Sequence, residues 1–529
     1  MWLVAAGLLL FGWRLGAHDV WPSDEPRFAL VAREMWERGD HVVLSLNDRL
    51  YTEKPPLFFW AVNGFAHLTG GVDELAARLP SVFSGVLALL LILKLGELLH
   101  DRPTGRLAAI IFATSLQILE RARWASIDMT LNLFVLAAIL LLWEGSREGA
   151  GGRWRVRLAW VMMGCATLAK GPVGLVLPLL AVVPAFIVLS EWQALRRVVL
   201  PSGVLLYVAV ALAWFVPFAL RIGPAHAVDL LTHQTVERYV DAWNAQHPVW
   251  YYLWRFPIGF FPWIIFLPWA VHAGLGRSRP LGERRAAIFL VCWIAAILLF
   301  FSLSTGKRGV YIIPLYPAAA ILVARLFRRS GSGSAATAPD AAPRVRAAFA
   351  VWAATVSAVA VAVVVAIPRR YPELWGAAFS VAVLLVVSAV VSLIVALRGR
   401  PVPAAHAVAA AMTGILLVCT ESVVPWANGQ LNLRGFAAEV RSHLRHDVPL
   451  AATEEKRDAW VFYTGRFVEE VDSREQVLAY LDGPPPRDLL IEEEFLGRIR
   501  GDLPAGLREV VRGRVSGRPH YLLRRETAP

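Results

Sequence analysis

The sequence predicts a polytopic α-helical membrane protein with a small α/β domain at its C-terminal end. Hydrophobic residues make up 57% of the 529 residues, whereas soluble domains average about 45–50%. The excess falls into separate apolar runs of roughly 17–22 residues, the length that crosses a bilayer. After about residue 424 the composition becomes charged, so the membrane part ends there.

The apolar runs predict about 13 transmembrane helices by this length rule. The first run lacks a basic start and a small-residue cleavage site, so we interpret it as a helix that is retained. The stretch Lys170-Gly171-Pro172 is compatible with one broken helix or with two helices. The runs lie near residues 1–16, 80–99, 107–120, 127–143, 158–169, 173–190, 199–219, 257–275, 286–303, 310–327, 347–367, 375–397 and 403–423.

Arginine residues in alternate loops predict the orientation of the chain. If the N-terminus is cytoplasmic, every cytoplasmic loop is basic, as the positive-inside rule requires. This placement explains the net charge of +12 without nucleic acid as a partner. It also predicts an odd number of spans and a C-terminus outside. The loop residues are Arg102, Arg106, Arg147, Arg153, Arg155, Arg157, Arg196, Arg197, Arg277, Arg279, Arg284, Arg285, Arg328, Arg329, Arg344, Arg346, Arg398 and Arg400.

Four parts follow from this topology. Residues 1–327 form a transmembrane module with long outer loops at 17–79 and 220–256, and residues 328–346 form a cytoplasmic linker rich in Gly, Ser and Ala. Residues 347–423 form further transmembrane helices, which we expect to be structural. Residues 424–529 form a periplasmic α/β domain without a catalytic motif.

Within the C-terminal domain, short apolar segments predict strands at 459–463 and 488–491. Helical patterns lie at 435–444 and 473–481. The three cysteines, Cys165, Cys292 and Cys419, each lie in an apolar run, and we interpret them as small core residues.

The first outer loop carries Asp24-Glu25-Pro26-Arg27 just past the first run. Asp24 can cap the helix that Pro26 starts, and the apolar face of that helix (Phe28, Val31, Ala32 and Met35) would then lie along the membrane surface. A carboxylate at the edge of the apolar layer also suits a general base. Both interpretations stay open for this segment.

Further charged residues map to the same outer side. Asp128 opens an apolar run, where ionisable groups are commonly functional, although it could also cap the helix. Lys54 follows Glu53 and precedes the Pro55-Pro56 pair, which stiffens the backbone. A lysine held there could bind a phosphate headgroup, or it could be an interfacial lysine that snorkels from the apolar run. Lys170 adds another cation.

The second outer loop adds Arg238, which could bind phosphate with two hydrogen bonds. His233, Glu237 and His247 could hold a metal, but their spacing matches no strict ligand pattern. Lys307 and Arg308 precede Tyr311 at an outer helix end, against the positive-inside trend, so we expect an anionic ligand there. This convergence resembles an active site for a lipid-linked phosphate.

Many short motifs in order resemble the bacterial aminoarabinose transferases of lipid A and, more broadly, the GT-C membrane glycosyltransferases related to protein O-mannosyltransferases. The resemblance covers about residues 18–325; the C-terminal third matches only in layout. The motifs are Asp24-Glu25-Pro-Arg-Phe-Ala, Gly39-Asp40, Leu46-Asn47, Tyr51-x-Glu53-Lys54-Pro55-Pro56-Leu57, Ala77-Arg78-Leu79-Pro80, Asp128-Met129, Lys170-Gly171-Pro172-x-Gly174, Pro248-x-Trp250-Tyr251-Tyr252, Phe261-Pro262-Trp263 and Tyr311-x-x-Pro314-x-Tyr316-Pro317.

The resemblance implies an inverting glycosyltransferase of the GT-C type in the bacterial inner membrane. Its donor would be a sugar on a polyprenyl phosphate, most simply undecaprenyl phosphate, and its acceptor would be lipid A or another envelope molecule on the periplasmic side. Asp24 would be the catalytic carboxylate, and Asp128 would support the site. Lys54 and Arg238 would hold the departing phosphate, and Tyr311 would contact the donor.

The charged residues on the outer side complete the predicted substrate-binding set with Glu25, Lys170 and Lys307. The resemblance further implies that Glu53 matches a position that can bind a metal ion in relatives. A divalent metal ion therefore stays open as a cofactor. Two alternatives also stay open: a transporter or flippase of lipid-linked sugars, which would typically show inverted repeats, and a protein O-glycosyltransferase. The sequence leaves the sugar and the acceptor undetermined.

Overall fold

The computed structural model describes the whole chain except residues 23, 225–245, 277–278, 331–340, 454–455 and 527–529. The chain forms two compact units. The first comprises Met1–Trp13, Thr52–Phe58 and Leu79–Thr420, and the second comprises Arg14–Tyr51, Phe59–Arg78 and Glu421–Pro529.

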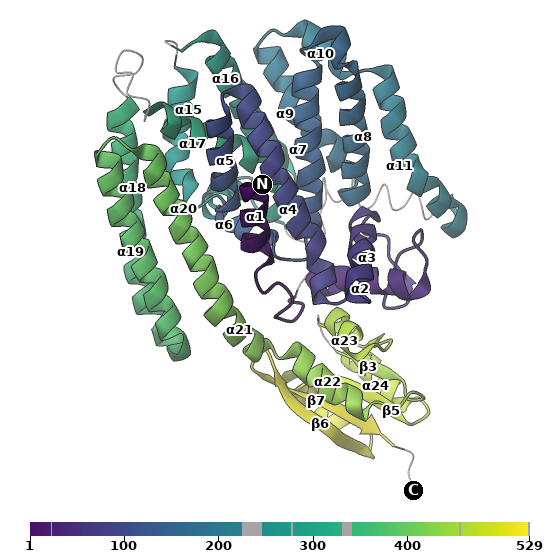
Figure 1. Cartoon of the computed structure of the whole chain (residues 1–529). Helices are drawn as coiled ribbons and strands as arrows, with labels where there is room; N and C mark the ends of the chain where they lie inside the picture. Colours follow the sequence, from purple (N-terminus) through teal and green to yellow (C-terminus); the bar gives the residue numbers. More distant parts are fainter. Residues whose placement is uncertain (23, 225–245, 277–278, 331–340, 454–455, 527–529) are drawn as a thin grey trace. The chain divides into compact units, whose positions relative to one another are not determined.

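The first unit is helical (Figure 1). Helix α4 begins in the second unit and enters the first at Leu79. The α-helices of this unit are α1 (Trp2–Gly12), α4 (Glu74–Leu99), α5 (Arg102–Ala113), α6 (Leu116–Arg121), α7 (Ile127–Gly145), α8 (Arg153–Lys170), α9 (Val173–Val188), α10 (Trp192–Val198), α11 (Pro201–Ile222), α14 (Tyr251–Gly259), α15 (Leu267–Leu275), α16 (Leu281–Leu303), α17 (Tyr316–Ser330), α18 (Ala341–Arg370), α19 (Trp375–Leu397) and α20 (Pro401–Val418). The 3-10 turns are η1 (Gly149–Gly152), η3 (Trp263–Phe266), η4 (Gly309–Leu315) and η5 (Pro372–Leu374).

The multi-pass membrane architecture is confirmed. Among the described residues, eight helices are long and apolar enough to cross a membrane, or nine if one bent pair counts as a span. Each predicted apolar run is largely helical, but several of the helices have fewer than 18 residues, such as α5 with 12 and α9 with 16. The number 13 therefore stays a prediction.

The described helices of the first unit include two breaks. At Lys170-Gly171-Pro172 the chain forms two helices, α8 and α9, which pack against each other. Gly171 has φ of +80°, a conformation that favours glycine and ends the helix. Between α14 and the helical segment from Trp263 to Leu275, the axis bends by 110°.

Aromatic stacking and small residues pack the interior of the first unit. The Trp143 ring of α7 stacks on Phe289 of α16 at 3.8 Å and on Phe186 of α9 at 5.3 Å between centroids. The span Gly309–Ser330 is 89% buried over its apolar window, so it forms the centre of the helix packing. Figure 1 shows α18, α19 and α20 side by side, and α18 and α19 expose many Val residues, as lipid-facing helices do.

The second unit combines the first outer loop with the C-terminal domain. Its loop contributes α2 (Glu25–Arg38), most of α3 (Leu57–Thr69) and a short hairpin of β1 (Ser45–Leu46) and β2 (Arg49–Leu50). The C-terminal part contributes α21 (Val424–Leu431), α22 (Leu433–His443), β3 (Leu450–Ala452), α23 (Arg457–Thr464), β4 (Glu469–Glu470), α24 (Arg474–Asp482), β5 (Arg487–Glu492), α25 (Glu493–Ile499), η7 (Arg500–Asp502), β6 (Leu507–Val515) and β7 (Arg518–Arg525).

The C-terminal strands form one sheet in the order β4-β3-β5-β7-β6. Strands β4, β3 and β5 are parallel, whereas β7 is antiparallel to both β5 and β6. Figure 1 shows β6 and β7 as the long hairpin of this sheet. The predicted α/β character is therefore confirmed, as are the strand at 488–491 and the helices at 435–444 and 473–481.

One predicted strand is wrong. Residues 459–463 belong to helix α23, which ends at Gly465 with φ of +68°. Five consecutive apolar residues carry no alternation, so their period cannot separate a strand from a buried helical turn.

The apolar face of α2 also differs from its prediction. Phe28, Val31, Ala32 and Met35 are at most 7% exposed and are covered by protein within the second unit, not by a membrane surface. Helix α2 packs against α23, and Arg27 of α2 lies 3.5 Å from the carboxylate of Asp458. Burial raises the pKa of Asp458, and the Arg27 guanidinium opposes that shift.

Candidate active site

A carboxylate–lysine pair joins the ends of two helices in the first unit. Asp128 lies in the first turn of α7, and Lys170 is the last residue of α8. The Lys170 Nζ donates to Oδ1 of Asp128, and each side chain is only 15% exposed. Separating such a pair would leave a poorly solvated charge, so the contact ties the start of α7 to the end of α8.

Tyr311 completes this cluster. The Lys170 Nζ lies 4.6 Å from the centroid of the Tyr311 ring, a cation–π distance. Turn η4, which carries Tyr311, packs against α7. The structure thus brings together Asp128, Lys170 and Tyr311, three predicted site residues that come from separate segments.

Tyr252 of α14 extends the cluster, although the sequence analysis placed it only in a motif. Its hydroxyl donates to the Arg308 carbonyl oxygen at 3.2 Å, three residues before Tyr311. Tyr252 also lines a cavity of about 380 Å³, which falls in the size range of ligand pockets. The lining is almost wholly apolar and comprises Val249, Trp250, Tyr252, Leu253, Phe256, Pro257, Leu298 and Ser302.

Glycine allows close packing beside this cluster. A side-chain carbon at Gly309 would lie 2.2 Å from Nε of Arg255, so only glycine leaves room for that guanidinium against η4. This contact places a cation from α14 next to the turn that carries Tyr311. Arg255 was not predicted, because one arginine within an apolar helix gives no signal of where it packs.

Lys307 makes a different contact from the predicted one. It is 2% exposed, and its Nζ donates to the carbonyl oxygens of His247 (2.8 Å) and Ser304. A backbone bridge between Gln246 and Gly306 lies beside it. Lys307 therefore anchors the segment before α14 to the end of α16, and its predicted role in substrate binding stays a prediction.

In the second unit, Glu25 forms a buried ion pair with Arg78. Nε and Nη2 of Arg78 donate to the two carboxylate oxygens at 2.7 and 2.8 Å, and the two side chains are 0% and 1% exposed. The Trp21 amide donates to the same carboxylate at 2.9 Å. This pair fixes the Glu25 side chain, and its predicted substrate contact stays a prediction.

The remaining donors of Arg78 bind the backbone that precedes Asp24. Nη1 donates to the Leu15 and His18 carbonyl oxygens at 2.7 and 3.0 Å, and Nη2 donates to that of Asp19 at 2.7 Å. One guanidinium therefore holds the chain on both sides of Asp24. The sequence analysis quoted Arg78 only within a motif and did not predict this role.

Asp24 itself is the N-cap residue of α2. Its side chain makes no capping hydrogen bond, and it is half-buried. The capping interpretation therefore does not account for its carboxylate.

Lys54 is largely buried, with 12% of its side chain exposed, and its Nζ donates to the Glu53 carbonyl oxygen at 2.9 Å. The Glu53 carboxylate lies 4.0 Å from the same Nζ. The helix after Pro55-Pro56 begins only at Leu57.

No described group of three or more His, Cys, Asp or Glu side chains could hold a metal ion. Glu53 therefore lacks a ligand set within the described part of the chain, and we derive no step through a metal. Arg238, His233 and Glu237 lie outside the described residues.

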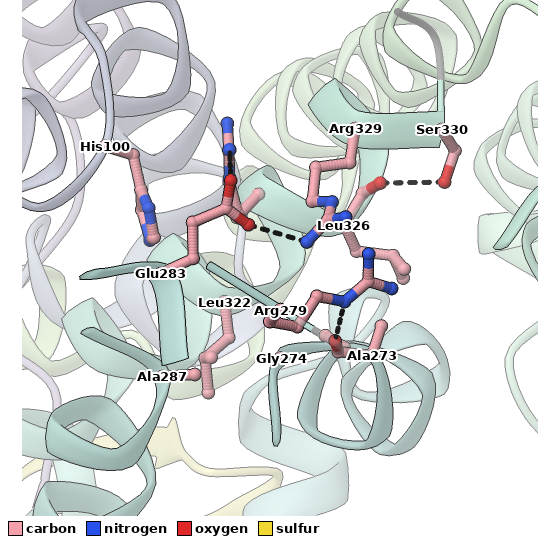
Figure 2. Close-up of a pocket in the computed structure, with 12 residues that line it drawn as sticks. His100, Ala273, Gly274, Arg279, Glu283, Ala287, Leu322, Leu326, Arg329 and Ser330 are labelled. Carbon is pink, nitrogen blue, oxygen red and sulfur yellow. Dashed lines mark hydrogen bonds and ion pairs between the residues drawn. The ribbon is translucent and has the colours of Figure 1, made fainter. Parts of the chain in front are cut away.

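A second cavity in the first unit is lined mainly by residues of α15, α16 and α17 (Figure 2). Its volume of about 20 Å³ holds roughly one water molecule. Glu283 pairs with Arg325 and Arg329 at 2.7 and 2.6 Å, and Arg325 also reaches Asp101 at 3.2 Å. The cavity is therefore too small and too well paired for a substrate. It does show that three loops predicted to share one membrane side, near residues 101, 283 and 329, meet in the structure.

Comparisons with known proteins bear on this arrangement. Residues 53–220 match the family described as dolichyl-phosphate-mannose-protein mannosyltransferase. Over its whole length the chain resembles the crystal structure of ArnT from Cupriavidus metallidurans bound to undecaprenyl phosphate, with a TM-score of 0.79, 23% identity, and 98% and 97% of the two chains covered. The chain has the aminoarabinose-transferase fold.

Curated relatives agree with this fold. The undecaprenyl phosphate-alpha-4-amino-4-deoxy-L-arabinose arabinosyl transferase of Erwinia tasmaniensis is 33% identical over 346 residues, 63% of this chain and 60% of the relative. The enzyme of the same name from Pectobacterium atrosepticum is 32% identical over 338 residues, 61% of this chain and 58% of the relative. The chain thus aligns with about 60% of the length of these relatives. The predicted resemblance to the aminoarabinose transferases is confirmed, and the fold likeness extends through the C-terminal third.

The Asp128–Lys170 pair gives a first prediction. Replacing either residue alone, by Asp128→Asn or Lys170→Met, leaves the other charge without its partner and lowers the unfolding temperature. The double variant removes both charges, so it loses less than the sum of the single variants, with a coupling of about 0.5–3 kcal/mol. Thermal unfolding of the four proteins in one detergent measures this coupling. Additive losses would contradict a direct pair.

Proposed function

We propose that this chain is an inverting glycosyltransferase that moves a sugar from a polyprenyl-phosphate donor to an acceptor on the periplasmic side of the bacterial inner membrane. The acceptor would be lipid A or another envelope glycolipid, and undecaprenyl phosphate would be the lipid carrier. The observation that carries this proposal is the Asp128–Lys170–Tyr311 cluster, joined through Tyr252 to an apolar cavity. A charged cluster beside an apolar cavity suits a substrate with a phosphate at one end and a hydrocarbon chain at the other.

The chemistry needs few groups. An acceptor oxygen attacks the anomeric carbon, the bond from that carbon to the phosphate oxygen breaks, and the polyprenyl phosphate leaves with the electron pair. In this proposal Asp24 accepts the proton of the acceptor hydroxyl. Lys54 and Arg238 balance the charge of the departing phosphate, so no acid is needed for the leaving group. Lys170 and Tyr311 line the donor side, and Asp128 holds Lys170.

The names of the relatives support this choice of donor, since they specify an undecaprenyl-phosphate aminoarabinose. The direct test supplies that donor to the purified chain in lipid nanodiscs, together with lipid A. We expect mass spectrometry to detect lipid A that is heavier by one sugar. A transporter would leave the acceptor unmodified, and a protein O-glycosyltransferase would modify a protein hydroxyl in its place. Either result would contradict a glycolipid acceptor.

Lys54→Ala provides a second test. If Lys54 binds the lipid phosphate, its loss removes a charge-assisted contact and weakens donor binding by roughly 10- to 100-fold. The binding of undecaprenyl phosphate can be measured by microscale thermophoresis. Lys94→Ala is the matched control, because Lys94 is an exposed lysine on α4. Equal donor affinity in the Lys54 variant and the control would exclude the phosphate role.

A further inference from the structure

The C-terminal domain has a topological switch point. From β3 the chain passes through α23 to β4, which neighbours β3 on the side away from β5. From β5 it continues to β6 and β7, which lie on the side of β5 away from β3. Strands β3 and β5 are parallel neighbours. In open α/β sheets, ligands bind in the crevice beyond the carboxyl ends of two such strands.

A cavity lies at this position. Its volume is about 340 Å³, within the range of small-molecule sites. Thr453 directly follows β3, Asp472 follows β4, and Glu492 ends β5, so three carboxyl ends of parallel strands contribute to its wall. The other lining residues are Arg457, Glu494, Phe495 and Arg498.

Thr453 carries an unused hydrogen-bonding group in this cavity. Its amide donates to the Leu490 carbonyl oxygen of β5 at 3.1 Å, which holds the residue beside the next strand. The residue is 2% exposed, and its hydroxyl has no hydrogen-bond partner among the described residues. Buried polar groups are nearly always paired, so an orphan hydroxyl on a cavity wall indicates a ligand group.

The charges of the wall are paired with each other. Nη1 of Arg457 donates to both oxygens of Asp472 at 2.8 Å, and Arg518 donates to Glu492 at 2.7 Å. Arg498 pairs with Glu494. Each arginine at this wall thus has a carboxylate partner, an arrangement that disfavours a phosphate. No group of three or more His, Cys, Asp or Glu side chains among the described residues could hold a metal ion.

We propose that this cavity binds a neutral saccharide. Sugar hydroxyls both donate and accept, so they can bond to the unpartnered Thr453 hydroxyl and to the guanidinium and carboxylate groups of the wall. The apolar face of a pyranose ring can pack on Phe495. The site goes beyond the proposed transfer reaction, because no step of that reaction uses this cavity. It would give the C-terminal domain a glycan-binding function.

The test uses the full-length chain in lipid nanodiscs, since a maltoside detergent would offer a competing sugar. Saturation-transfer NMR with N,N′-diacetylchitobiose as the probe should show saturable binding. Thr453→Val keeps the side-chain shape but removes the hydroxyl, so it should weaken binding by about tenfold. The same variant should unfold at an equal or higher temperature, because it removes an unsatisfied buried group. If the Thr453 hydroxyl served only the fold, its removal would not weaken sugar binding while the unfolding temperature stayed equal or rose.

Phe495→Ala is the second variant, and Phe467→Ala is its matched control, because Phe467 is 48% exposed in the same domain and does not line the cavity. We expect only the Phe495 variant to lose the saturation signal. The proposal is overturned if the wild-type chain shows no saturable signal, if Thr453→Val binds as tightly as wild type, or if inorganic phosphate displaces the sugar. Each readout is independent of sugar transfer, so failure here leaves the proposed transferase function intact.

Discussion

Asp24→Asn should abolish sugar transfer, with a fall in kcat of about 10²–10⁴-fold, the usual contribution of a general base. The amide has nearly the same shape as the carboxylate but cannot accept the proton of the acceptor hydroxyl. Since Asp24 makes no capping hydrogen bond, the change removes no capping contact from α2. We expect protein abundance to stay close to that of wild type. Product formation from donor and acceptor, followed by mass spectrometry, measures the loss.

The control for this variant is Asp447→Asn, which neutralises an exposed carboxylate of the same unit. It should transfer sugar at the wild-type rate. Donor binding should also persist in Asp24→Asn, because the proposed phosphate contacts come from Lys54 and Arg238. Near-normal transfer by the Asp24 variant would exclude it as the base. If the variant lost both donor binding and sugar transfer, Asp24 would act on the donor and not on the acceptor.

Charge placement along the sequence predicted much of the candidate site. Asp128, Lys170 and Tyr311 were assigned to one membrane side from loop charges alone, and they contact one another in the structure. The positive-inside rule is informative here because a short loop confines its residues to one face of the membrane. It cannot tell how a side chain points, so it did not separate a ligand-binding lysine from one that binds backbone carbonyls, as Lys307 does.

The sequence predicted those parts of the fold that depend on the length and composition of apolar runs. The multi-pass helices and the strand at 488–491 followed from apolar runs, whereas residues 459–463 form a helix because burial overrides a short apolar pattern. Arg78 was the largest omission. An arginine at the start of an apolar helix is typical of a membrane boundary. Only the tertiary structure reveals that Leu15, Asp19 and Glu25 all bond to Arg78.

Arg78→Lys should lower kcat by about 100-fold, the effect expected when a reacting group moves by roughly 1 Å. The guanidinium holds Glu25 with two hydrogen bonds and also binds three carbonyl oxygens before Asp24. A lysine ammonium has three donors and no planar fork, so it cannot keep both sides of Asp24 in place. Glu25→Gln should act in the same direction, because it replaces one acceptor oxygen with an amide that faces Arg78.

A positioning role differs from a purely structural one in its kinetics. Arg123→Lys provides the comparison, because Arg123 is 8% exposed and donates to backbone carbonyls of residues 10, 11 and 13. Both lysine variants should lower the unfolding temperature, but only the Arg78 variant should lower kcat in the protein that remains folded. The KM for the donor should stay unchanged in both. An equal kcat in the two variants would mean that Arg78 contributes stability alone and that Asp24 keeps its position without it.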